Sequence, residues 1–276
     1  SSSIEIDGAT CTNNAALTVA GTTYGDQLYI GGVLGTISST YYRFNNGAKF
    51  INNGKLSMND SAEAAKVIRI GGVIGYAYNK MADHVDTSTA MCYMINTGEI
   101  YFGGSAQQHL DIGGVIGRTG TACNEVAMIN TGNIKAYGKF TEKYSTGSSK
   151  NNVRVGGIIA YSANKAMTNV QCYCNIEAYT VAKSGDSYTF TSYPLVGMIC
   201  GNPSKFDSGL VNNAKIGGKI ATNATVENDA ITPTWTELKA TNYFDYIIGI
   251  REGITSYAGV DYLPNKDAVV LPNVGE

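Results

Sequence analysis

The sequence predicts an all-β fold: a parallel β-solenoid of about six coils, with three strands per coil and a C-terminal cap. Three observations lead to this prediction. A glycine-rich motif recurs at an almost constant spacing, a second motif with asparagine alternates with it, and apolar residues follow a period of two that is typical of strands. These observations are compatible with a right-handed or a left-handed solenoid.

The first motif is an apolar strand that ends in two glycines. A well-kept copy reads Ile112-Gly113-Gly114-Val115-Ile116-Gly117, and equivalent copies begin at Ile30, Ile70, Val155 and, in a decayed form, Val196. The first glycines of successive copies are 40, 42, 43 and 41 residues apart. Glycine suits a tight corner because it lacks a Cβ atom. The spacing therefore predicts one coil per repeat.

The second motif is an Asn-x-Gly turn, as in Ile95-Asn96-Thr97-Gly98-Glu99-Ile100. Close copies contain Asn52 and Asn130, and looser copies contain Asn13, Cys172 and Asn212. Each repeat then has a strand after this turn, a strand that runs into Gly-Gly, and a third strand that leads to the next asparagine. Aligned repeats place apolar residues in columns that we expect to fill the core, among them Leu56, Ile100 and Ile134.

The repeat ends near residue 227, which predicts two parts of the chain. Residues 1–227 form a β-solenoid of ~40-residue repeats. Residues 228–276 form a C-terminal capping segment, which is rich in aromatic residues such as Trp235 and Tyr243. A solenoid exposes an open strand edge at its end, and an uncovered edge promotes aggregation. A cap at this position would cover that edge.

The charge and motif content exclude several classes of function. Charged residues make up only 15% of the chain and the formal net charge is −2, so nucleic acid is not an expected partner. The sequence has no apolar run long enough for a transmembrane segment. Its two histidines are isolated and it has no Gly-x-Ser-x-Gly motif. We therefore predict no catalytic residues, no cofactor and no metal, and thus no enzyme.

The six cysteines are expected to be mostly free thiols. Cys11, Cys92 and Cys200 fall in apolar columns, where they behave as small buried hydrophobic residues. Cys172 and Cys174 replace the asparagine and the glycine of the turn motif. One disulfide and a metal site remain as alternatives, although a metal site would need further ligands.

These motifs resemble the GLUG-motif repeat family, in which Val-Gly-Gly-Leu-Val-Gly precedes a segment like Ile-x-Asn-Cys-Tyr-Asn-Thr-Gly-x-Ile. Here Ile112-Gly113-Gly114-Val115-Ile116-Gly117 precedes Met128-Ile129-Asn130-Thr131-Gly132-Asn133-Ile134. Ile or Val replaces the family's Leu in most copies, and its Cys-Tyr pair survives only as shifted fragments such as Cys92-Tyr93. The resemblance covers nearly the whole chain. It implies an exported bacterial β-solenoid of adhesin-like surface proteins, without a catalytic residue set of its own.

Charged residues occupy outward positions between the apolar columns. Tyr29, Arg69, Asp111 and Arg154 align, so we expect Asp111 to lie between two arginines of neighbouring coils. Lys55 likewise aligns with Glu99, and Lys135 with Glu177. We interpret these as cross-strand pairs on a solvated face.

Two insertions, at residues 139–152 and 181–193, interrupt the repeat at the same corner. Insertions on one face of a solenoid are often its binding side. The candidate ligand-binding residues in them are aromatic: Tyr144, Tyr188, Phe190 and Tyr193. Aromatic rings suit sugar faces or protein partners. The alternative is a pair of solvated loops that fold their aromatic residues inward.

The sequence therefore favours a non-enzymatic, adhesin-like module for cell adhesion. We expect it at the extracellular side of a bacterial outer cell surface, after removal of an export signal that this chain does not contain. Its partner would be a host or bacterial surface glycan or protein, bound through loops on one face. We expect a monomer or part of a longer chain. A structural spacer in a larger surface protein and a polysaccharide-acting β-helix enzyme remain as alternatives.

Overall fold

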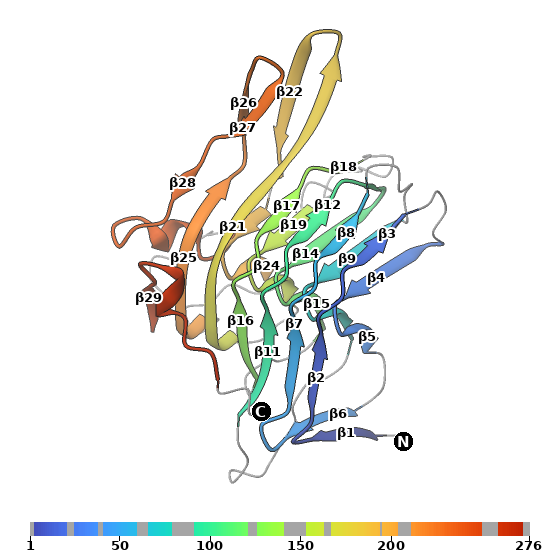
Figure 1. The fold of residues 1–276 in the computed structure, drawn as a ribbon, viewed down its shortest axis with the longest axis vertical. Coiled ribbons are helices and arrows are strands. Elements are labelled where there is room, and N and C mark those ends of the chain that lie inside the picture. The colour runs from blue at the N-terminus through green and yellow to red at the C-terminus, as the bar shows by residue number, and fades with distance from the viewer. Residues whose placement is uncertain are drawn as a thin grey trace.

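The structure is a computed structural model that describes residues 3–20, 25–37, 41–59, 66–78, 91–120, 126–140, 153–162, 167–193, 195–203, 211–249 and 259–272. These residues form an all-β parallel β-solenoid, which confirms the predicted fold class. Strands of successive coils lie side by side from the blue N-terminal coils to the orange C-terminal coils (Figure 1).

Two of the three large sheets meet at the Gly-Gly corner, and each has five parallel strands. The strands before the corner are β4 (Gln27–Gly31), β9 (Val67–Gly71), β14 (His109–Gly113), β19 (Val153–Gly156) and β23 (Leu195–Gly197). The strands after it are β5 (Leu34–Ile37), β10 (Ile74–Ala77), β15 (Ile116–Thr119), β20 (Ile159–Ser162) and β24 (Cys200–Pro203).

The third sheet has 13 strands and contains the Asn-x-Gly corner, so most coils contribute two short strands to it. The strands that lead to the corner are β2 (Thr10–Asn13), β7 (Lys49–Asn52), β11 (Cys92–Asn96) and β16 (Val126–Asn130). The strands that follow it are β3 (Leu17–Val19), β8 (Leu56–Met58), β12 (Ile100–Phe102) and β17 (Ile134–Ala136). In the last two coils, β21 (Met167–Ser184) and β25 (Val211–Ala221) pass the corner without a break.

Two pairs of short strands lie beside these sheets. One is the parallel pair of β1 (Ser3–Asp7) and β6 (Tyr41–Asn45), and the other is that of β13 (Ser105–Ala106) and β18 (Lys139–Phe140).

The core is built from the predicted apolar columns. Ile100 lies in register with Leu56 on one side and with Ile134 on the other, and all three side chains are buried. The same register brings Met94 beside Phe50 and Met128. Apolar residues therefore stack on apolar residues from coil to coil, which confirms the repeat alignment and places one continuous core inside the solenoid.

The Asn-x-Gly corner is held by a ladder of buried asparagine side chains. Asn52 Nδ2 donates to Asn96 Oδ1 over 2.8 Å, and Asn96 Nδ2 donates to Asn130 Oδ1 over 2.9 Å. Each of these amides also donates to the carbonyl oxygen two residues ahead, as Asn96 does to Gly98 over 3.0 Å. A buried polar group needs such partners. The ladder explains why asparagine recurs at this corner.

The insertion at residues 181–193 is a β-hairpin that projects from the solenoid. The end of β21 pairs with the antiparallel strand β22 (Ser187–Ser192), and Gly185 takes a positive φ of 58° in the turn. A second hairpin, β26 (Ala224–Glu227) with β27 (Ala230–Pro233), projects next to it (Figure 1). We call the two hairpins together the hairpin arm.

The segment after the arm adds a further partial coil and covers the last strands. It contains β28 (Thr236–Glu237), the 3₁₀ helices η2 (Tyr243–Tyr246) and η3 (Lys266–Ala268), and β29 (Val260–Tyr262). Strand β28 pairs with β25 in antiparallel fashion, whereas β29 pairs with it in parallel. The Met198 N–H donates to the Tyr246 carbonyl over 2.7 Å, and the Gly249 N–H to the Cys200 carbonyl over 3.0 Å. Residues 245–249 thus stack on the corner between β23 and β24 and form one more corner of the same kind.

The row of charges around Asp111 has the predicted register, but the prediction of a solvated face is wrong. Asp111 lies between Arg69 and Arg154, yet their exposed fractions are only 0%, 8% and 6%. The Gly-Gly corner is the physical reason. A Cβ at Gly117 would lie 2.8 Å from the Ile70 carbonyl oxygen, so the two sheets at this corner approach closely. Tyr76 and Tyr161, on strands that follow the corner, pack their rings against Arg69 and Arg154 and cover the row.

The second set of charges is paired differently from the prediction. Lys55 Nζ lies 2.9 Å from Glu99 Oε1 as expected, but Lys135 Nζ also pairs with Glu99, at 3.2 Å from Oε2. Lys135 is in register with Glu177, but the Glu177 carboxylate accepts hydrogen bonds from the hydroxyls of Tyr137 and Tyr179. The partly buried Tyr137 and the fully buried Tyr179 thus bind the carboxylate that was expected to pair with Lys135.

Candidate functional site

The four aromatic candidates do not form one ligand site in the part of the chain that the structure describes. Tyr144 lies outside the described residues. Tyr188 and Phe190 lie on β22, and Tyr193 follows that strand directly. Phe190 packs its ring on Tyr179 with centroids 5.8 Å apart, and Tyr193 is only 5% exposed. Phe190 and Tyr193 therefore anchor the hairpin arm to the solenoid.

The polar contacts of these residues tie the arm together. The buried Tyr193 hydroxyl donates to the Gly138 carbonyl over 2.7 Å, and burial raises the pKa of Tyr193 above its ordinary value of 10.0. Tyr188 donates to Asp229 Oδ1 over 3.0 Å, and Lys183 Nζ lies 3.3 Å from the same oxygen. Asp229 lies in the turn of the second hairpin, so these contacts join the two hairpins. Tyr188 remains partly exposed beside Lys183.

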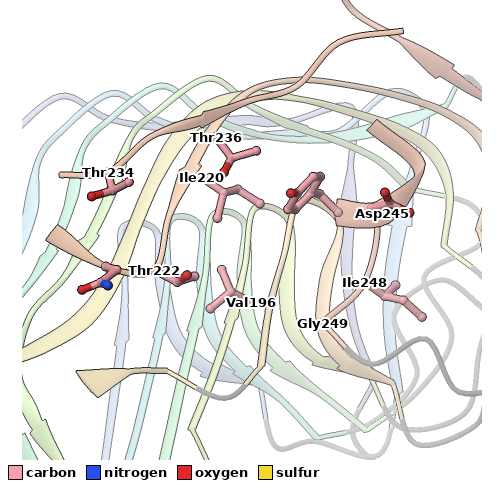
Figure 2. A pocket seen from close by; sticks show the side chains of 10 residues that line it. Val196, Ile220, Thr222, Thr234, Thr236, Asp245, Ile248 and Gly249 are labelled. Carbon is pink, nitrogen blue, oxygen red and sulfur yellow. The ribbon is translucent and has the colours of Figure 1, made fainter. Parts of the chain in front are cut away.

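A pocket of about 380 Å³ lies where the hairpin arm meets the last coils. Figure 2 shows Thr222 and Thr234 at one end of it, Asp245 and Ile248 at the other, and Val196 and Ile220 between them. Asn223, Thr236, Tyr246 and Gly249 complete the lining. The volume falls in the range of small-molecule sites, which is about 300–1,000 Å³.

Four separate segments position the lining. Val196 comes from β23 and Ile220 from β25, whereas Thr236 lies opposite Ile220 in the antiparallel pair of β25 and β28. The Thr234 N–H donates to the Asn223 carbonyl over 2.9 Å and closes the base of the second hairpin. The Ser192 hydroxyl donates to the Thr222 carbonyl over 2.6 Å, which attaches the first hairpin to the pocket wall.

The pocket combines apolar walls with several hydrogen-bonding groups. The lining residues include three threonines, an asparagine, a tyrosine and Asp245, next to the apolar Val196, Ile220 and Ile248. A sugar has the complementary pattern, because its hydroxyls both donate and accept while its C–H faces are apolar.

Sequence reasoning did not find this pocket, although one signal for it was present. Ile247-Ile248-Gly249 matches Val73-Ile74-Gly75 and indicates one more copy of this corner after residue 227, with Asp245 and Tyr246 in place of the two glycines. Recognising that copy would have placed Asp245 and Tyr246 against the fifth coil. The threonines of the other wall belong to no repeat, so their approach depends on how the second hairpin folds back.

The described cysteines Cys11, Cys92, Cys172, Cys174 and Cys200 are free thiols, whereas Cys123 lies outside the described residues. Cys172 takes the place of an asparagine beside Asn130, and its Sγ lies 3.6 Å from that of Cys174. Burial, and then the neighbouring Cys174, raise the pKa of Cys172 well above its ordinary value of 9.0. Both thiols are buried, and the Cys172 thiol remains protonated at neutral pH.

Within the described ranges, no group of three or more His, Cys, Asp and Glu side chains has the geometry to hold a metal ion. No helix among those residues is long and apolar enough to span a membrane. Comparisons with family models, with curated proteins and with solved structures find no match to this chain. The resemblance to the GLUG-motif family therefore stays a prediction.

Proposed function

We propose that this protein is a non-enzymatic, adhesin-like binding module that holds a sugar residue of a surface glycan in the pocket beside the hairpin arm. The observation that carries the proposal is the lining itself. A pocket of about 380 Å³ has hydroxyl, amide and carboxylate groups from four segments around an apolar centre. A location at the outer cell surface belongs to the same proposal and is supported by the family resemblance alone.

The proposed ligand site lies at the base of the hairpin arm, whereas the sequence predicted it in the inserted loops themselves. Phe190 and Tyr193 are used in packing, so their rings are not available for a ligand. The pocket lies next to the same hairpin, because Ser192 bonds to the Thr222 backbone. The insertion thus contributes to binding by supporting one wall of the pocket. Tyr188, which stays partly exposed, lies outside the pocket lining.

A glycan array tests the proposal with a double variant of the pocket, Thr222→Val and Thr234→Val. These substitutions nearly keep the shape of both side chains and remove two hydroxyls, so we expect weaker binding of the glycans that the wild type selects. Thr225→Val removes a hydroxyl from the second hairpin outside the pocket and serves as the control. Unchanged binding by the double variant would refute the pocket assignment. A wild type that binds no glycan would instead favour the structural spacer.

A further inference from the structure

The chain contains two Asn-Gly pairs, and the structure gives them opposite surroundings. Asn46-Gly47 lies in the turn between β6 and β7, and Asn53-Gly54 belongs to the corner that follows β7. In such a pair the backbone nitrogen of the glycine can attack the side-chain amide carbon of the asparagine, because glycine has no Cβ atom in the way. The attack also requires that the peptide between the two residues rotates, so the local packing decides whether the reaction occurs.

The Asn53-Gly54 pair is held by the neighbouring coil. Gly54 is buried, and its N–H donates to the Asn13 carbonyl over 3.3 Å, as does the Asn53 N–H over 2.8 Å. A Cβ atom at Gly54 would lie only 1.9 Å from the Ala15 carbonyl oxygen, which shows how closely the two coils approach here. The stacking of the coils therefore fixes this peptide and keeps its nitrogen in a hydrogen bond.

The Asn46-Gly47 pair lies at the surface. Both residues have a positive φ, 51° and 74°, in a tight turn, and the Asn46 side chain is exposed while Gly47 is half-buried. Asn46 Nδ2 donates to Asp7 Oδ1, and Asp7 is itself exposed at the end of β1. A bond between two exposed side chains opens more readily than a backbone bond between stacked coils. Water thus reaches the Asn46 amide group.

We propose that Asn46 is a site of spontaneous deamidation, a covalent modification that weakens the pairing of β1 with β6, whereas Asn53 is protected by the fold. The deprotonated Gly47 nitrogen attacks Asn46 Cγ and closes a five-membered succinimide ring. The Cγ–Nδ2 bond breaks, and the nitrogen leaves as ammonia with a proton in place of the one that Gly47 lost. Water then opens the ring at either carbonyl carbon and leaves an aspartate or an isoaspartate.

The reaction changes the contact with β1. The side chain at position 46 loses the N–H donor that Asp7 accepts from, and a second carboxylate takes its place. Like charges at this distance repel each other. Asp7 is in register with Asn45 at the last position of the β1–β6 pair, so the repulsion acts where the two strands end together. The proposal uses no residue of the pocket and is therefore independent of the proposed function.

Peptide mapping by mass spectrometry measures deamidation at both pairs in one sample of the protein, incubated at mildly alkaline pH. We expect Asn46 to react at least about tenfold faster than Asn53 in the folded protein, because Asn53 must wait for the coil to open. In the urea-unfolded chain the two rates should become similar. Equal rates in the folded protein, or a difference that persists in urea, would overturn the proposed protection by the fold.

Asn46→Asp imitates one product and tests the effect on β1. Hydrogen exchange of the backbone amides of residues 3–7 should become faster in this variant than in the wild type. Asn53→Asp also adds a negative charge in an exposed turn and is the matched control, which should leave the exchange of β1 unchanged. Equal exchange of β1 in Asn46→Asp and the wild type would refute the proposed weakening. A similar increase in Asn53→Asp would show a general charge effect and would refute it as well.

The double variant Asn46→Asp with Asp7→Asn tests whether the contact between the two side chains is responsible. It exchanges donor and acceptor, so the amide at position 7 can donate to the carboxylate at position 46 and no like charges remain. We expect the hydrogen exchange of β1 to return toward that of the wild type. Exchange in the double variant as fast as in Asn46→Asp would contradict this origin of the weakening.

Discussion

Asn52 and Asn96 lie in register on adjacent coils, and the Asn52 side-chain amide donates a 2.8 Å hydrogen bond to the Asn96 side-chain oxygen. Both side chains are fully buried. Each asparagine also caps its own turn by donating to a carbonyl two residues ahead. One residue type therefore both shapes the corner of a coil and joins that coil to the next.

The asparagine ladder predicts that Asn96→Ala strongly lowers the stability of the folded protein. The substitution leaves the Asn52 amide and the Gly98 carbonyl without the buried partner that Asn96 supplies. We expect the free energy of unfolding to fall by about 2 kcal/mol or more in urea titrations. Asn53→Ala is the matched control, since Asn53 is exposed and bonds to the exposed Asn14. A similar loss in both variants would contradict the role of the ladder.

The Gly-Gly corner predicts that Gly114 does not tolerate a side chain. A Cβ atom at Gly114 would lie 1.9 Å from the Gly157 carbonyl oxygen and 2.3 Å from Asn130 Nδ2. Because a backbone oxygen cannot move aside easily, we expect Gly114→Ala to lower the free energy of unfolding by about 3 kcal/mol or more.

Gly25→Ala is the control for this prediction, because a Cβ there would meet no atom within 4 Å. Its thermal midpoint should match that of the wild type. If Gly114→Ala were also as stable as the wild type, the close stacking of the corners would be wrong.

The sequence determines the repeated part of this fold well. Ile70, Ile112 and Val155 occupy equivalent buried positions because each coil must present the same side chain to the next coil, and such columns are visible in an alignment of the repeats. The burial of Asp111 was not visible, since alternation along one strand does not show that a neighbouring sheet covers its outer side. The pocket was missed for a similar reason: Thr234 reaches Asn223 only through the fold of a non-repeating hairpin.

The structure of the hairpin arm predicts a large loss of stability for one aromatic residue in the inserted loop and a small change for another. Tyr193 is buried and bonds to Gly138, so Tyr193→Ala should lower the free energy of unfolding by about 3–5 kcal/mol. Tyr188 lies on the partly exposed side of the hairpin, so Tyr188→Ala should change it by less than about 1 kcal/mol. Denaturant titration of the two variants measures both values. Equal losses would contradict the assignment of Tyr193 as the anchor.

The buried thiol of Cys200 predicts a loss of stability in alkaline solution. Burial raises the pKa of Cys200 from its ordinary value of 9.0 to about 12. Between these two values the unfolded chain releases a proton that the folded protein keeps. The free energy of unfolding should therefore fall as pH rises, by at most about 1.4 kcal/mol per pH unit from this one group.

Cys200→Ala tests whether this thiol causes the loss of stability at alkaline pH, because the substitution removes it. The variant is expected to be less stable at pH 7 but to lose less further stability between pH 9 and pH 11 than the wild type. Parallel curves for the two proteins would show that Cys200 does not contribute to the alkaline transition.

The central claim is that a sugar binds in the pocket beside the hairpin arm, and methyl NMR tests it most directly. The Ile220 and Ile248 methyl groups belong to the pocket lining, whereas those of Ile30 on β4 and Ile37 on β5 lie in the core at the other end of their sheets, away from β23 and β24. During titration with a glycan selected on the array, we expect the Ile220 and Ile248 signals to shift in a saturable manner while the Ile30 and Ile37 signals stay in place. Saturable binding that leaves both Ile220 and Ile248 unshifted would contradict the account.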